Sequence, residues 1–214
     1  MIQDDGRVNR IIHHRQMLRF MPILAAAAAF FATIGCVNPS GSGPGFAVEI
    51  AWEGRVPALS LALSELSGPA GVVEAERMAR LALATAERLR RDWRPVGPPL
   101  FNNLLVNMGY RERGLCYQWT NDLLEPLEER VWRSFDLHWG TSRWGDKARE
   151  HNAVVITARG RPFSEGLVLD AWRHGGRLIW LPVRDDDKYR WRPLTASELE
   201  QHRPVARASA THGF

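Results

Sequence analysis

The spacing of apolar residues changes once along the chain, from a helical period to a strand pattern. In residues 71–93, GVVEAERMARLALATAERLRRDW, apolar side chains recur every three or four positions, as on a helix with one buried face. Short apolar runs rich in β-branched residues then follow in residues 151–158, HNAVVITA, and 177–183, RLIWLPV. Helices first and strands afterwards predict an α+β domain in which helices, one of them carrying Cys116, pack on an antiparallel sheet.

Two more helices are expected between these regions. Residues 98–110, PPLFNNLLVNMGY, form a short helix with Gly109 as its stop. A second helix begins near Cys116, and we expect Pro126 to end or kink it. The remaining strands are expected in RSFDLHWGTS and GLVLDAWR.

The first residues have the pattern of an export signal. Phe20 to Gly35 is an uncharged run of 16 residues after Arg19, shorter than the ~20 residues that span a bilayer. Thr33-Ile34-Gly35-Cys36 resembles a bacterial lipobox, which implies cleavage before Cys36 and lipid on its sulfur. We therefore expect a signal in 1–35 (with Met17 as a candidate true start), a tether in 36–46, one domain in 47–200 and a flexible tail in 201–214.

The lipobox resemblance also implies a location and a partner. Val37 follows the cysteine where Asp would retain a Gram-negative lipoprotein in the inner membrane, so we expect a lipid anchor in the outer membrane, on the periplasmic side. The chain has a net charge of +4, and its arginines do not form a stripe with nucleic-acid motifs, so no nucleic-acid partner is expected. The sequence has no CxxC, HExxH or phosphate loop, so we expect no cofactor and no metal.

Cys116 is the residue that most suggests chemistry. If Cys36 carries lipid, Cys116 has no partner for a disulfide within the chain, and an exported free thiol is either buried or used. An ordinary thiol with a pKa of about 8.5 is only a few per cent thiolate at neutral pH, and a helix N-terminus lowers such a pKa by about one unit. A nucleophilic Cys116 would therefore need a nearby imidazolium.

The choice of histidine rests on position in the predicted sheet. His151 opens a strand and can meet a helix terminus at the rim, whereas His138 lies within a strand and is the competing candidate. His174 lies in a turn, and His202 and His212 lie in the expected tail. Asp170 falls opposite His151 if the hairpin turn centres on Gly160-Arg161, and it would then orient the imidazole. The sequence does not fix this register, and a longer loop would slide Asp170 by a few residues.

These residues carry a family resemblance. GLCYQW, then HNAVVIT, then LVLDAW resemble the transglutaminase-like core of the papain-like cysteine enzymes, over about residues 98–185. The resemblance implies Cys116 as nucleophile, His151 as general base and acid, and Asp170 as the orienting residue. Papain-type enzymes place an oxyanion-binding Gln about six residues before the cysteine. Here that position is Tyr110, with Asn103 and Asn107 as other donors that the sequence leaves open.

Two functions follow from these assignments. The first is a lipid-anchored thiol hydrolase or acyltransferase that acts on amide bonds of peptides or of the cell wall, with Trp119 and Trp172 packed near the site to exclude water. The second is a non-catalytic envelope lipoprotein that uses the same scaffold for binding or assembly, with Cys116 as a buried small side chain.

Overall fold

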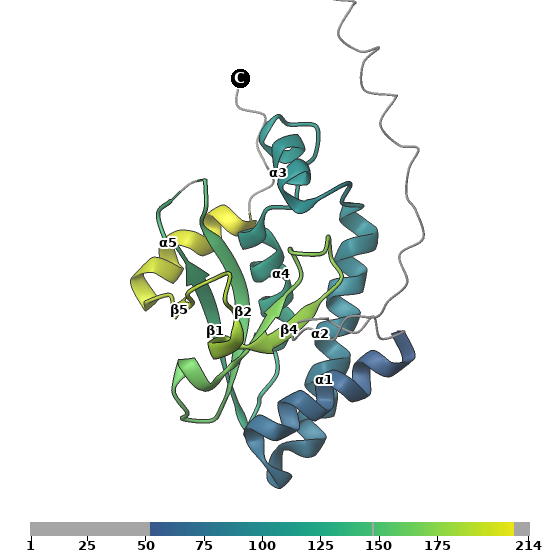
Figure 1. The fold of residues 1–214 in the computed structure, drawn as a ribbon, viewed down its shortest axis with the longest axis vertical. Coiled ribbons are helices and arrows are strands. Elements are labelled where there is room, and N and C mark those ends of the chain that lie inside the picture. Colours follow the sequence, from purple (N-terminus) through teal and green to yellow (C-terminus); the bar gives the residue numbers. More distant parts are fainter. Residues whose placement is uncertain (1–51, 147, 208–214) are drawn as a thin grey trace, which may run out of the picture. The chain divides into compact units, whose positions relative to one another are not determined.

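The computed structural model describes residues 52–146 and 148–207. Within them, helices α1 (Trp52–Ser67), α2 (Val72–Trp93), α3 (Pro99–Asn107) and α4 (Cys116–Glu128) precede the strands, and α5 (Ala196–Arg207) follows them. The strands are β1 (Phe135–Ser142), β2 (His151–Ala158), β3 (Leu167–Asp170), β4 (Ile179–Pro182) and β5 (Arg192–Pro193). Short 3₁₀ turns occupy η1 (Pro69–Gly71), η2 (Phe163–Glu165) and η3 (Val183–Asp185). The predicted α+β order is confirmed for the described residues (Figure 1).

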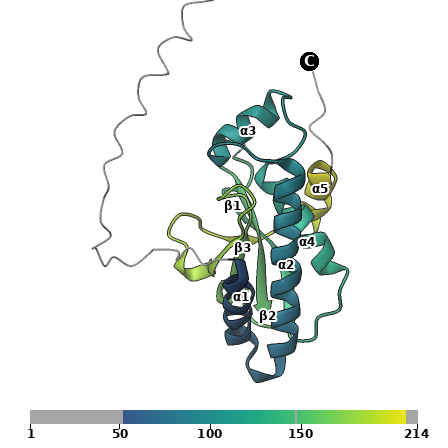
Figure 2. The ribbon, with the colours of Figure 1, turned by 90° about the vertical axis from the view of Figure 1, so that its right-hand side faces the viewer.

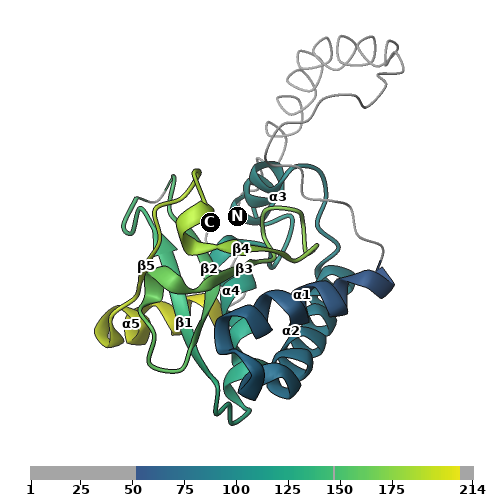
Figure 3. The ribbon, with the colours of Figure 1, turned by 60° about the horizontal axis from the view of Figure 1, so that its bottom comes forward.

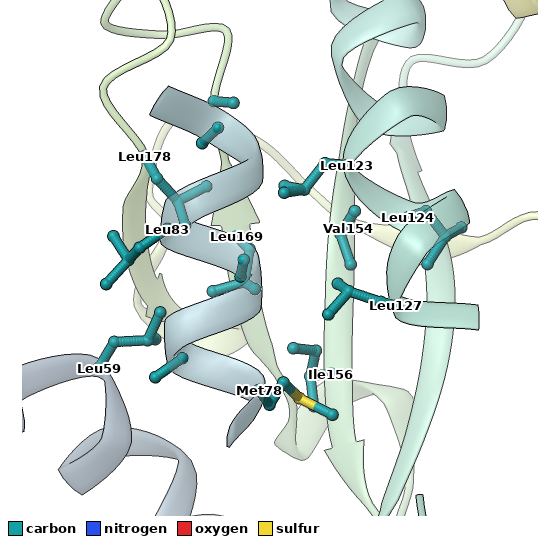
Figure 4. Packing of buried hydrophobic residues seen from close by; sticks show 14 of the residues in the cluster. Leu59, Met78, Leu83, Leu123, Leu124, Leu127, Val154, Ile156, Leu169 and Leu178 are labelled. Carbon is teal, nitrogen blue, oxygen red and sulfur yellow. The ribbon is translucent and has the colours of Figure 1, made fainter. Parts of the chain in front are cut away.

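The strands form one antiparallel sheet with the order β4-β3-β2-β1-β5. Its centre, β2, is buried along almost its whole length, so its sequence is a nearly continuous apolar run without alternation. Helices α1, α2 and α4 cover one face of the sheet (Figures 2 and 3). Figure 4 shows part of this core, where Met78 of α2 lies beside Ile156 of β2, Leu123 of α4 lies beside Val154 of β2, and Leu83 of α2 lies on the side of Leu59 of α1.

The opposite face of the sheet carries a smaller apolar cluster. Ala153, Val155 and Val168 are buried there beneath Phe163, Leu181, Val183 and Trp191. Side chains alternate between the faces of a strand, so residues 151, 153 and 155 share this face while Asn152 and Val154 point toward the helices. His151 and Asn152, adjacent in sequence, therefore leave β2 on different sides.

The register of the β2–β3 hairpin, which the sequence left open, is not the one with a turn centred on Gly160-Arg161. Val154 pairs with Leu169, and Ile156 pairs with Leu167. Compared with a register that sets Asp170 opposite His151, β3 is therefore shifted by two residues along β2. A slide of two residues keeps every side chain on its face, because the strand period is two. Asp170 and His151 are therefore diagonal neighbours, not direct partners, on the same face.

Two parts of the domain were not foreseen. Helix α1 lies in a region to which the sequence assigned no element, and α5 occupies residues 201–207 of the expected flexible tail, where it packs on α4. The predicted tail is therefore wrong as far as Arg207, because Ala206 is buried and Arg203 pairs with Glu128 of α4.

The predicted signal, Cys36 and the tether to residue 46 lie outside the described residues. None of the helices in the described part of the chain is long and apolar enough to cross a membrane.

Candidate active site

Cys116 is the first residue of α4, and side chains of the same helical turn hold the loop before it. Gln118 Oε1 accepts hydrogen bonds from the backbone N–H groups of Gly114 at 2.8 Å and Leu115 at 3.0 Å. Trp119 Nε1 donates to the carbonyl of Gly114 at 3.1 Å. The thiol is thereby fixed at a helix N-terminus, where N–H groups without an intrahelical acceptor favour negative charge.

His151 and Asp170 meet at the rim of the sheet as a buried pair. His151 Nε2 and Asp170 Oδ2 are 2.6 Å apart, and neither side chain is more than 2% exposed. The other ring nitrogen, Nδ1, is buried and makes no hydrogen bond with a described residue. Nδ1 is therefore the nitrogen left for exchange of a proton with Cys116, whose side chain is near enough to affect the histidine's pKa.

The electrostatics of the pair favour its charged form. Burial by itself lowers the pKa of His151, but the charge and hydrogen bond of Asp170 outweigh burial, Cys116 adds to their effect, and the pKa rises to about 9. Burial likewise acts to raise the pKa of Asp170, yet the charges and hydrogen bonds of His151 and Arg173 hold it below its usual value. An imidazolium facing a carboxylate is therefore the stable state at neutral pH.

Asp170 is held by four hydrogen bonds. Its Oδ1 accepts from the backbone N–H groups of Trp172 at 2.9 Å and Arg173 at 3.1 Å, and its Oδ2 accepts from Arg173 Nε at 2.6 Å as well as from the histidine. Arg173 also pairs with Asp186, whose Oδ2 accepts from Trp191 Nε1 at 2.8 Å. This chain of charges fixes the carboxylate that orients the imidazole.

Aromatic rings pack around the imidazole. The ring centroids of Tyr189, Trp172 and Trp191 lie 4.3, 4.7 and 5.4 Å from that of His151. Trp172 thus lies at the site, as the sequence led us to expect. Trp119 does not line the cleft, because its indole is buried in the helical core against Trp93, and it acts on the site only through the loop before Cys116.

Asn152 is a site residue that the sequence did not single out. Its Nδ2 lies 3.8 Å from the sulfur of Cys116, and its Oδ1 accepts a 2.9 Å hydrogen bond from Trp139 Nε1. An indole N–H can only donate, so Trp139 fixes the amide with its N–H₂ group toward the sulfur. The backbone carbonyl of Glu150 is 3.7 Å from the same sulfur. The one signal in the sequence was that Asn152 follows His151 on the strand.

The thiol and imidazole lie at a cleft of about 690 Å³. Its walls come from α3, α4, the β1–β2 loop, α5 and the turn after β3, and the lining includes Asn103, Asn107, Cys116, His151, Trp172 and Tyr189. Tyr110 is not among the lining residues. The chain turns at Gly109 after α3 ends, and the Tyr110 side chain is 72% exposed. The structure therefore does not bring the predicted oxyanion donor to the cleft, whereas it does bring both asparagines there.

Of the competing histidines in the described part of the chain, His138 is separated from the thiol and His202 lies at the cleft, while His212 lies outside the described residues. His138 lies opposite Val155, four residues along β2 from His151, and its Nε2 is 2.9 Å from the hydroxyl of Thr157. His202 was assigned to the tail, but α5 brings it to the cleft wall, with Nε2 3.6 Å from Glu150 Oε1. Nothing local in the sequence indicated that His202 lies near Cys116, because the contact depends on how α5 packs.

Comparison of the chain with protein-family models, with curated proteins and with solved structures finds no match. Among the described residues, no three His, Cys, Asp or Glu side chains are grouped so that they could hold a metal ion.

Proposed function

We propose that the protein is a thiol enzyme that cleaves or transfers amide-linked acyl groups, with Cys116 as nucleophile, His151 as acid and base, and Asp170 as the orienting group. The observation that carries this proposal is the use of His151 Nε2 for Asp170, which leaves Nδ1 for a thiol fixed at a helix start. The arrangement of a cysteine helix packed on an antiparallel sheet also supports the resemblance to the transglutaminase-like core, which remains part of the proposal.

In the proposed reaction, the Cys116 thiolate attacks the carbonyl carbon of an amide and forms a tetrahedral oxyanion. His151 gives its Nδ1 proton to the leaving amine as the C–N bond breaks, which leaves a thioester and a neutral imidazole. Water or a second amine then attacks the thioester, and Nδ1 takes the proton of that nucleophile. The C–S bond breaks and restores the thiolate–imidazolium pair, with release of an acid or a new amide.

Two donors are placed to stabilise the oxyanion. The backbone N–H of Cys116 has no acceptor within its own helix, because it lies in the first turn. Asn103 Oδ1 accepts from Trp172 Nε1 at 2.9 Å, and since an indole N–H only donates, the Asn103 amino group is left to face elsewhere in the cleft that both residues line. We propose Asn103, in place of Tyr110, as the side-chain donor, and its loss would cost about 10²–10³ in rate.

The test uses an activated ester, because it requires little substrate recognition. p-Nitrophenyl acetate should release a burst of p-nitrophenol, place an acetyl group on Cys116, and then turn over slowly. Cys116→Ser should abolish the burst and His151→Ala should reduce it at neutral pH, while His138→Ala should leave it unchanged. Acetylation of Cys116 no faster than that of a denatured thiol would refute the enzyme and favour the non-catalytic scaffold.

We propose further that the enzyme is held in the cell envelope by lipid on Cys36, and that peptides or cell-wall amides are its substrates. The lipobox resemblance supports the anchor. Intact-mass analysis of protein purified from membranes should show a chain that begins at Cys36 and carries lipid, and Cys36→Ala should prevent that modification. An unmodified Cys36 in the wild-type protein would contradict this part alone.

A further inference from the structure

Helix α3 presents its apolar side to solvent. Leu100, Phe101 and Leu104 of α3 and Met108, the residue that caps its C-terminal end, are here called the α3 apolar face, and they are 69%, 48%, 51% and 47% exposed. At 100° per residue they fall within one arc of about 100°. This is the reverse of a helix at the surface of a soluble domain, whose exposed side is polar.

The opposite side of α3 is the one that holds it to the domain, and it includes polar residues. Asn102 is only 3% exposed, and its Oδ1 accepts from the backbone N–H of Val96 at 3.2 Å. A side chain added to Gly114 would come within 2.2 Å of the Asn102 amide nitrogen, so the two segments are in close contact. The exposed leucines therefore result from an orientation that these polar contacts fix, and turning α3 to bury them would break those contacts.

The charges near this face are mostly basic, although the exposed acidic residues Asp92 and Glu112 flank the segment. From Trp93 to Arg111 the chain has no acidic residue, and α3 lies beyond the C-terminal end of α2 (Figures 1 and 2). Arg88, Arg91 and Arg94 at that end of α2 are exposed and have no ion-pair partner among the described residues. An exposed apolar helical face, with exposed and unpaired cations at the adjoining helix end, is typical of a segment that lies in the interface of an anionic bilayer.

We infer that the α3 apolar face docks on the surface of an anionic lipid bilayer. This docking is separate from lipid on Cys36 and does not depend on the proposed catalysis. Leucine and phenylalanine side chains enter the boundary between headgroups and acyl chains, while the arginines contact lipid phosphates. Leu100 belongs both to this face and to the lining of the cleft, so docking would hold the opening of the cleft at the membrane surface.

The test measures the depth of single positions in the full chain. Cys36→Ala and Cys116→Ser remove both native thiols, and a nitroxide is attached at Leu104→Cys or, as control, at Val131→Cys, where the native side chain is 87% exposed and lies after α4. Vesicles contain phosphatidylglycerol and phosphatidylcholine. The measured quantity is the rate at which the nitroxide collides with oxygen, divided by the rate at which it collides with a water-soluble nickel chelate. When vesicles are added, this ratio should rise several-fold for the label at position 104 and should not rise for the label at position 131. Circular dichroism checks that each labelled chain is folded.

Three outcomes would overturn the inference. In protein bound to vesicles, the label at position 104 could remain as accessible to the nickel chelate as the label at position 131. It could be protected before vesicles are added, which would assign the face to a second copy or to another segment of this chain. If the label at position 104 reached the same depth on vesicles of pure phosphatidylcholine as on vesicles with phosphatidylglycerol, the role of the arginines would be refuted. Because Cys116→Ser is present throughout, failure here leaves the catalytic proposal untouched.

Discussion

The pH dependence of Cys116 alkylation tests the central pair most directly. With a pKa of about 9, His151 is ~97% imidazolium at pH 7.5, whereas with its ordinary value of 6.5 it would be ~9%. In the proposed ion pair, the imidazolium compensates the negative charge of the sulfur, so the pair should stay reactive at pH values where an ordinary thiol with a pKa of about 8.5 is mostly neutral, about 0.3% ionised at pH 6. We therefore expect the iodoacetamide rate of the wild-type protein to differ by no more than about twofold between pH 6 and 7.5.

Replacing His151 with alanine should restore ordinary behaviour. Below a pKa of about 8.5 the thiolate fraction rises tenfold per pH unit, so the rate should increase about 30-fold from pH 6 to 7.5. Asp170→Asn removes the charge that outweighs burial, so the pKa of His151 should fall and much of the low-pH reactivity should be lost, though less than in His151→Ala.

The matched control is His138→Ala, because that ring contacts Thr157 away from the thiol. Its alkylation profile should follow that of the wild-type protein. The choice of histidine would be wrong if His138→Ala abolished the reactivity at pH 6 and His151→Ala did not. If every variant and the wild type showed the same 30-fold rise, no thiolate–imidazolium pair would exist and the non-catalytic function would be favoured.

Three further perturbations address stability. Gln118→Met should lower the free energy of unfolding by about 1–3 kcal/mol in urea titrations, because two loop N–H groups lose their acceptor; an unchanged midpoint would contradict that role. Arg173→Met should cost ~3–5 kcal/mol, because it leaves the buried Asp170 carboxylate with fewer partners. The stability advantage of wild type over His151→Gln should be complete below pH 6.5 and decline by on the order of 3 kcal/mol as pH rises through about 9, since folding raises the pKa of His151. A pH-independent difference would show that the pKa is not raised.

Local periodicity was enough to place the elements that bear the site. The apolar spacing of residues 72–93, the glycine before Cys116 and the β-branched run after His151 all depend on neighbours within a few positions, and the structure has α2, α4 and β2 there. The positions of Cys116 at a helix start and His151 at a strand start follow from the same local patterns.

Packing between distant segments decided the rest. The order of residues left the hairpin register of Asp170 open, and the observed one depends on how β3 buries Leu167 and Leu169 against the helices. Asn152 faces the sulfur because Trp139 of the neighbouring strand donates to its amide oxygen and Glu150 accepts from its amide nitrogen. The network from Asp170 to Asp186, the place of His202 and the outward apolar side of α3 all join residues far apart in sequence. The local spacing of residues in one sequence carries no information on such contacts. Their energies depend on which surfaces meet after the helices and the sheet have packed.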